Sequence, residues 1–154
     1  MSKNKTELTF STLREANTAR LPTFRTAKGE IAHSKEDGSD WSLSDWSNAV
    51  LGELGEAANI IKKLRRPDFE LDDRPPEFKG LTVREALAEE FADTVTYLDI
   101  LAMQVGVDLG QATFDKFNKI SKRVDSPITL RASTRLDDLV AIAQAKRGSS
   151  RCKT

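Results

Sequence analysis

Two long stretches of the chain combine apolar side chains at helical spacing with a pair of acids beside the apolar face. The first, residues 46–66, reads WSNAVLGELGEAANIIKKLRR and contains Glu53 and Glu56. The second includes LAEEFADTVTYLDILA and contains Glu90 and Asp93. Residues three apart on a helix lie on neighbouring parts of one face. If these two helices pack together, the sequence predicts that the four carboxylates lie across from one another.

The rest of the chain also favours helices. We expect a short helix from about residue 9 to residue 20 and longer ones over 83–104 and 109–124, in addition to 46–66. Thr82 with Glu85 forms a capping box at the start of the 83–104 helix, and Gly106 and Pro127 follow the last two helices. Strand signals are nearly absent, and only residues 127–130 could pair briefly. The sequence therefore predicts an all-α protein with a four-helix bundle.

Composition limits the kinds of partner. The chain has 154 residues, enough for one domain, and a formal net charge of zero, so no bulk charge attracts a nucleic acid polymer or an acidic membrane. The N-terminus lacks the apolar core of a signal peptide, and no apolar run approaches the length of a membrane span. The single cysteine, Cys152, cannot form an intramolecular disulfide. We expect a soluble cytoplasmic protein.

The acidic pairs have two interpretations, and their spacing alone leaves both open. They are either ordinary solvated helix residues or ligands of a metal ion. The second interpretation gains support because the spacing recurs and because the 83–104 helix is apolar around most of its circumference, so acids on it need a partner. Carboxylates that lie close together repel one another unless a cation lies between them, and hard oxygen ligands suit Mg²⁺.

Other chemistries lack their motifs. The chain has no P-loop, no glycine-rich dinucleotide fingerprint and no zinc spacing of Cys and His. Neither acidic pair carries the histidine of a helical di-iron site, and no Ser or Cys groups with a histidine for nucleophilic catalysis. The remaining chemistry is oxygen-ligated magnesium acting on phosphate.

Several polar and aromatic residues are candidates for contacts with such a substrate. Basic residues close to a helix C-terminus usually compensate the helix dipole, but beside a carboxylate–metal centre they also suit a polyphosphate chain. Asn118 is either a donor to phosphate or sugar or a plain surface residue, and Trp46 is either a core residue or a stacking platform. The candidates for substrate binding are Lys63, Lys116, Asn118, Arg123 and Trp46.

The order of these motifs resembles the MazG-like, all-α nucleotide pyrophosphohydrolases. The likeness covers residues 41–126 and consists of GELGEAAN, EEFADTVTYLDILA and VDLGQATFDKFNKISKRV in that order. Many members carry a further glutamate directly before the first motif residue, where this chain has Gly52. The resemblance implies a MazG-like domain over residues 1–126. Residues 127–154 are then an extension, with a weakly helical patch at 136–145 and a disordered end.

The resemblance also implies an activity. Members hydrolyse a nucleoside triphosphate between its α and β phosphates, which gives a monophosphate and pyrophosphate. By this likeness Glu53, Glu56, Glu90 and Asp93 would hold Mg²⁺ or Mn²⁺ and act in catalysis, and a homodimer or homotetramer would complete the bundle. The alternatives are a non-catalytic helical protein that binds a nucleotide or a metal, and an oligomeric interaction module; Gly52 favours these.

Overall fold

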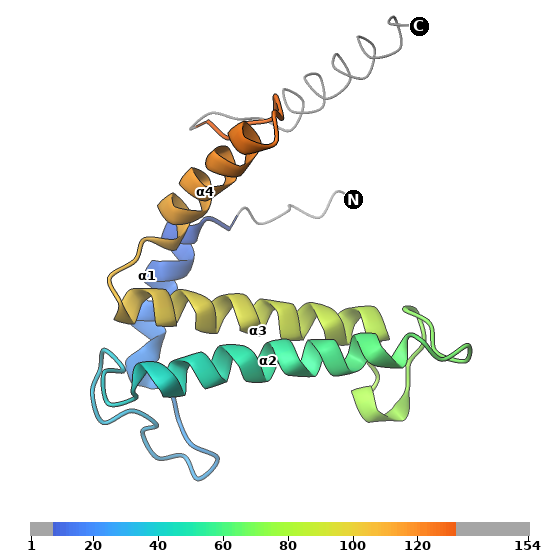
Figure 1. The fold of residues 1–154 in the computed structure, drawn as a ribbon. Helices are drawn as coiled ribbons and strands as arrows, with labels where there is room; N and C mark the ends of the chain where they lie inside the picture. Colours follow the sequence, from blue (N-terminus) through green and yellow to red (C-terminus); the bar gives the residue numbers. More distant parts are fainter. Residues whose placement is uncertain (1–7, 132–154) are drawn as a thin grey trace, which may run out of the picture. The chain divides into compact units, whose positions relative to one another are not determined.

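The computed structural model describes residues 8–131, and its regular structure is helical (Figure 1). No strand occurs within residues 8–131, where the β-type pairing is an isolated bridge between Arg25 and Ile31. The all-α prediction is confirmed, and the strand considered at 127–130 does not form. The patch at 136–145, the polar tail and Cys152 lie outside the described residues. The helices are α1 (Phe10–Arg20), α2 (Leu43–Lys63), α3 (Val83–Gln104) and α4 (Leu109–Arg123), with short 3-10 helices η1 (Leu21–Thr23) and η2 (Pro76–Phe78).

Side-chain caps set where the helices begin. The Thr82–Glu85 capping box opens α3 as predicted, and α3 ends at Gln104 as predicted. The sequence offers Ser42 and Ser44 as caps for the helix that contains residues 46–66. Ser42 is the cap, and because it forms a second capping box with Asp45, α2 begins at Leu43. The prediction overlooked the aspartate of that box. At its other end α2 stops at Lys63, and the following residues form turns.

The chain divides into two compact units between residues 107 and 108. The MazG-like domain over residues 1–126 stays a prediction. The first unit contains α1, α2 and α3. The second contains α4, and within it the side-chain amide of Asn118 exchanges two hydrogen bonds with the backbone of Leu130, at 2.8 and 3.1 Å. This pairing satisfies the peptide groups of Leu130 without a strand partner.

Helices α2 and α3 run antiparallel and side by side in the first unit (Figure 1). Two separate apolar clusters join them. One lies near the 64–82 connection and contains Ala57, Ile60, Val83, Ala86 and Leu87. The other lies at the opposite end, where Leu21, Trp46 and Ile100 are buried. Between the clusters, residues 47–56 of α2 and 88–98 of α3 include no buried side chain, so the acidic pairs occupy the middle of the helix pair.

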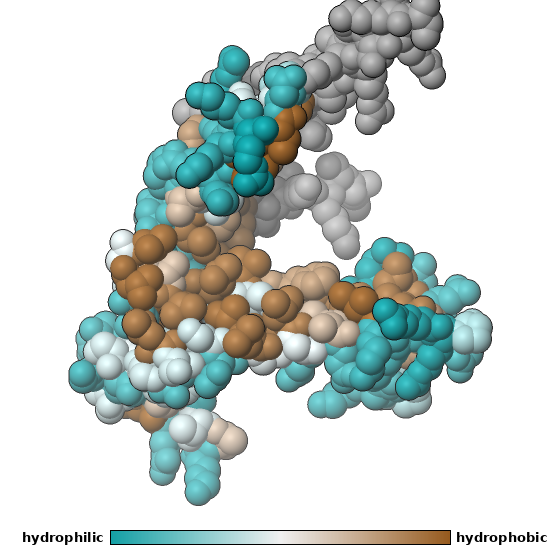
Figure 2. All heavy atoms as spheres, viewed as in Figure 1, coloured by the Kyte–Doolittle hydropathy of each residue, from teal (hydrophilic) through white to brown (hydrophobic). Residues whose placement is uncertain are grey.

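The face that the sequence predicts to be apolar on each helix is only partly buried. On α3, Leu87 and Ala102 are buried, whereas Phe91, Val95 and Leu98 are exposed. On α2, Leu54 and Ile61 are exposed as well. These exposed apolar residues form one stripe on each helix, beside the line along which α2 and α3 touch. Because the helices are antiparallel, both stripes lie on the same side of the helix pair, and the acids lie on the other side. Figure 2 shows apolar side chains gathered over the C-terminal half of α3.

A buried polar contact attaches α1 to α3. Asp99 is 1% exposed and accepts hydrogen bonds from Arg14 Nη2 at 2.9 Å and from Asn17 Nδ2 at 2.9 Å. Arg14 also donates to the carbonyl of Val107 at 3.1 Å. In the sequence, Asp99 falls roughly opposite Glu90 on the 83–104 helix, which favours a polar contact at a subunit interface. Its partners instead come from α1 of the same chain.

No helix in the described part has the length and the apolar character needed to cross a bilayer.

Gly38 packs against Leu21 and Trp46 of the second apolar cluster. Its φ is +71°, and a Cβ there would lie 2.7 Å from Leu21 Cδ2 and 3.0 Å from Trp46 Cζ2. Its carbonyl accepts the indole N–H of Trp46 at 3.2 Å. Only glycine fits both the conformation and the space.

Replacing Gly38 should therefore destabilise the fold. We expect Gly38→Ala to reduce the free energy of unfolding by roughly 2–4 kcal/mol, because backbone strain and overpacking add. Gly29→Ala is the matched control, since Gly29 also has a positive φ, +82°, but no atom lies within 4 Å of the position that a Cβ would take there. Urea denaturation measures both, and equal losses for the two variants would contradict the packing role.

Candidate metal centre

Three of the four predicted carboxylates meet between α2 and α3. Glu53 and Glu56 lie one turn apart on α2, and Glu90 comes from the facing turn of α3. One carboxylate oxygen of each lies within 4.8 Å of the others. Glu53 and Glu90 are half-buried, and Glu56 is exposed. The spacing of three residues is what brings both α2 acids to the helix edge that faces Glu90.

The electrostatics of this trio are unfavourable for the fully ionised state. Burial raises the pKa of Glu53, and the charges of Asp93 and Glu56 raise it further. Burial also raises the pKa of Glu90, followed by the charges of Glu56 and Glu53. Because carboxylate oxygens of Glu53 and Glu90 lie within 4.8 Å of each other, a proton on one of them would reduce this repulsion. The trio therefore favours binding either a proton or a cation.

The donor set fits a hard divalent cation. All its ligand atoms are carboxylate oxygens, which Mg²⁺ prefers and which Mn²⁺ also accepts. The trio lies at the edge of a pocket, where water can complete the coordination shell, as Mg²⁺ requires. A cation there would also relieve the repulsion that, after burial, raises the pKa values of Glu53 and Glu90. The residues that would hold it are Glu53, Glu56 and Glu90.

Asp93 lies beside this trio without joining it. It is one turn beyond Glu90 on α3, and its side chain is exposed. Its negative charge raises the pKa of Glu53, of Glu90 and of Tyr97, for which burial is the larger cause. The four acids thus form one electrostatic group, of which three have ligand atoms at metal-binding distance.

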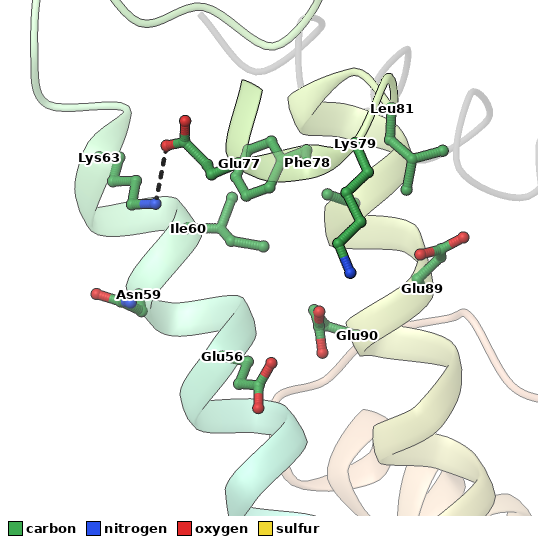
Figure 3. A pocket seen from close by; sticks show the side chains of 11 residues that line it. Glu56, Asn59, Ile60, Lys63, Glu77, Phe78, Lys79, Leu81, Glu89 and Glu90 are labelled. Carbon is green, nitrogen blue, oxygen red and sulfur yellow. Dashed lines mark hydrogen bonds and ion pairs between the residues drawn. The ribbon is translucent and has the colours of Figure 1, made fainter. Parts of the chain in front are cut away.

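A pocket of about 600 Å³ opens from the trio toward η2 (Figure 3). Glu56 and Glu90 stand at one end, and the 64–82 connection supplies the opposite wall. The volume lies within the range of small-molecule sites. The side chains that line the pocket are Glu56, Asn59, Ile60, Lys63, Glu77, Phe78, Lys79, Leu81, Ala86, Glu89 and Glu90.

Lys63, a predicted substrate contact, does line this pocket. Its ammonium forms an ion pair with Glu77 at 3.2 Å and lies 5.1 Å from the ring centroid of Phe78. The prediction missed Lys79, which belongs to the same wall. Lys79-Gly80 comes shortly before the Thr82 capping box. A cation in a turn that leads into the second acidic helix is the sequence signal that could have identified Lys79.

The other predicted contacts lie elsewhere. Lys116 and Arg123 are exposed on α4 in the second unit, and the Asn118 amide is bonded to Leu130. Their contacts with a substrate stay predictions. Trp46 has no exposed surface, and its ring packs against His33 and Trp41. In this conformation Trp46 serves as a core residue and leaves no face for a ligand.

His33 is the one histidine of the chain, and it belongs to this aromatic cluster rather than to the acidic group. It is 4% exposed, and its Nδ1 lies 3.3 Å from Asp40 Oδ1.

Comparison of the chain with protein-family models, with curated proteins and with solved structures finds no match. The function is therefore inferred from the site itself.

The raised pKa values predict how the trio affects stability. A carboxyl whose pKa is higher in the folded protein than in the unfolded chain binds its proton more tightly when folded. The metal-free protein should therefore gain stability as the pH falls toward the ordinary glutamate value of 4.5 and lose that gain as the pH rises again.

Removing one negative charge from the trio should likewise stabilise the metal-free protein at neutral pH. We expect Glu53→Gln to raise the melting temperature by a few degrees in chelator, and to reduce the further rise that millimolar Mg²⁺ gives the unaltered protein. Differential scanning fluorimetry measures both. Glu15→Gln, at an exposed position of α1, is the control and should change neither value. A lower melting temperature for Glu53→Gln in chelator would contradict the repulsion.

Proposed function

We propose that this protein is a magnesium-dependent nucleoside triphosphate pyrophosphohydrolase. The observation that carries the proposal is the meeting of Glu53, Glu56 and Glu90 at the end of a pocket that also presents lysines. Oxygen ligands for a divalent cation and cations for phosphate are the two requirements of phosphoryl chemistry. The resemblance of the acidic motifs to the MazG-like family supports the same reaction.

The bonds that change are those of an anhydride hydrolysis. A water oxygen bonds to the α phosphorus, the bond from that phosphorus to the α–β bridging oxygen breaks, and the products are a nucleoside monophosphate and pyrophosphate. Bound Mg²⁺ would lower the pKa of water and neutralise charge on the phosphoryl oxygens. The carboxylates would orient the attacking water, and one of them would accept its proton.

Asp93, the second acid of α3, would complete the proposed metal site. Asp93 stands one turn from Glu90 and already acts on the trio through its charge. We assign it to the metal site on that ground and on the family pattern. Lys63, Lys116, Asn118 and Arg123 would contact the phosphates or the sugar, in a cytoplasmic enzyme.

The second candidate is a non-catalytic protein that binds a nucleotide or a metal on the same scaffold. Gly52 is the feature that favours it, because many family members carry a glutamate at that position. A side chain would fit there, since nothing lies within 4 Å of the position that a Cβ would take at Gly52. The absence of an acid at this position is thus a property of the sequence and is not enforced by packing.

The activity is tested by pyrophosphate release from a panel of nucleoside triphosphates, with Mg²⁺ and with chelator. We expect release only with Mg²⁺, and Glu56→Ala and Asp93→Ala should each reduce kcat by at least about 100-fold. Circular dichroism should show both variants folded, because both positions are exposed. No release from any triphosphate, with Mg²⁺ still raising the melting temperature, would leave the non-catalytic candidate.

We further propose that a second copy of the chain covers the exposed apolar face of α2 and α3. This face consists of two stripes on the same side of the helix pair, and their members are Leu51, Leu54, Ile61, Phe91, Val95 and Leu98. A contiguous apolar surface of this kind marks an interface. The acids lie on the opposite side, so a homodimer or homotetramer can bury the face without covering the pocket.

Adding charge to this face should separate the subunits. We expect the double variant Leu51→Lys, Leu98→Lys to elute as a monomer of 17.1 kDa in size-exclusion chromatography with light scattering, and the unaltered protein at two or four times that mass. Ile31→Lys is the control, because Ile31 is 62% exposed but lies outside both stripes. A monomeric unaltered protein would contradict the proposal.

A further inference from the structure

We propose that Lys79 is the phosphate-binding cation of the α2–α3 pocket, and that it binds a polyphosphate only together with a divalent cation. The ligand class is the terminal phosphates of the nucleotide that the proposed function requires, and the inference rests on that function. Lys79 comes from the turn after η2, between the two acidic motifs in the sequence, and the fold brings it into one pocket with Glu56 and Glu90.

The direction and the availability of the side chain point to this role. Figure 3 shows Lys79 extending from the η2 turn toward Glu56 and Glu90. Within residues 8–131 its ammonium has no hydrogen bond or ion pair, whereas the other pocket lysine, Lys63, is paired with Glu77 at 3.2 Å. Lys79 is therefore the cation that is free to meet a ligand.

The turn that carries Lys79 is held in place by the core. Phe78, the residue before it, packs on the cluster around Ala57 and Ile60 and contacts the ring of Phe69. The backbone N–H of Lys79 donates to the carbonyl of Pro76 at 3.2 Å, and that of Leu81 donates to the carbonyl of Phe78 at 2.9 Å. These contacts fix the point from which the side chain reaches the pocket.

The backbone of Lys79 itself is unusual. Its φ is +51°, in the left-handed region that a residue with a side chain rarely adopts, and the next residue is Gly80 with φ +96°. A glycine would fit the conformation of Lys79 with less strain, so the strain is consistent with a role for the side chain.

The charges of the pocket determine when an anion can enter. Its lining includes four carboxylates, those of Glu56, Glu77, Glu89 and Glu90, against two ammonium groups, which gives a formal charge of −2. A polyphosphate alone is repelled by such a lining. One divalent cation at the acidic end balances this charge, and the phosphates can then bridge from that cation to Lys79.

Inorganic tripolyphosphate is a suitable probe, because it presents the phosphates without a base or a sugar. We expect the unaltered protein to bind it with Mg²⁺ and not with chelator, as measured by isothermal titration calorimetry. Lys79→Met should weaken binding with Mg²⁺ by roughly 10- to 100-fold, the loss expected for one charge-assisted hydrogen bond. Lys79→Arg should recover most of the affinity.

Lys62→Met is the matched control, because Lys62 is exposed on α2 near the pocket without lining it, and it should bind as the unaltered protein does. In turnover, Lys79→Met should raise KM more than it lowers kcat. Equal binding by Lys79→Met and the unaltered protein would overturn the assignment, and binding in chelator would overturn the requirement for the cation.

Different results would contradict the proposed pyrophosphohydrolase activity and the assignment of Lys79. If no triphosphate is hydrolysed but tripolyphosphate binds with Mg²⁺ and Lys79→Met weakens that binding as expected, the pyrophosphohydrolase proposal fails and the role of Lys79 stands. If triphosphates are hydrolysed and Lys79→Met leaves both KM and tripolyphosphate affinity unchanged, the activity stands and the assignment of Lys79 is overturned.

Discussion

The mutual repulsion of the carboxylates between α2 and α3 is the constraint on which the rest of this structure depends. An antiparallel helix pair normally fills its contact line with apolar side chains, but here Glu53, Glu56 and Glu90 occupy the middle. The apolar contacts are consequently divided into two clusters, one at each end of the pair. The stability that the ends contribute allows the fold to tolerate a charged centre, which is the kind of compromise found at functional sites.

Each end of the helix pair has its own support. At the 64–82 connection, Phe69 and Phe78 pack on the first cluster, and the same segment forms a wall of the pocket. At the other end, the loop before α2 packs against Trp46, and the carbonyl of Gly38 accepts a hydrogen bond from the indole N–H of Trp46. The connection near the acids thus contributes both to folding and to the proposed binding of phosphate, so the composition of this loop bears on function as well as on stability.

The two sides of the helix pair differ in chemistry. The side with the acids opens into a polar pocket, and the other presents leucine, isoleucine, valine and phenylalanine to solvent within one chain. This arrangement explains why α3 is apolar around so much of its circumference. One apolar stripe completes the clusters inside the chain, and the second is available to another subunit.

Local patterns determined the helices, because caps and 3.6-residue periodicity depend on neighbours in the sequence. The sequence predicts residues 83–104 to the residue, and it offers Ser42 as a cap of α2, although the prediction did not include Asp45 as the second member of that capping box. The i, i+3 spacing likewise predicted that acids of two helices would meet. Tertiary structure alone decided which apolar stripe is buried, that Asp99 pairs with Arg14, and that Lys79 points toward the acids. These contacts join residues far apart in the chain, and their geometry depends on helix rotation and loop path, which no local pattern specifies.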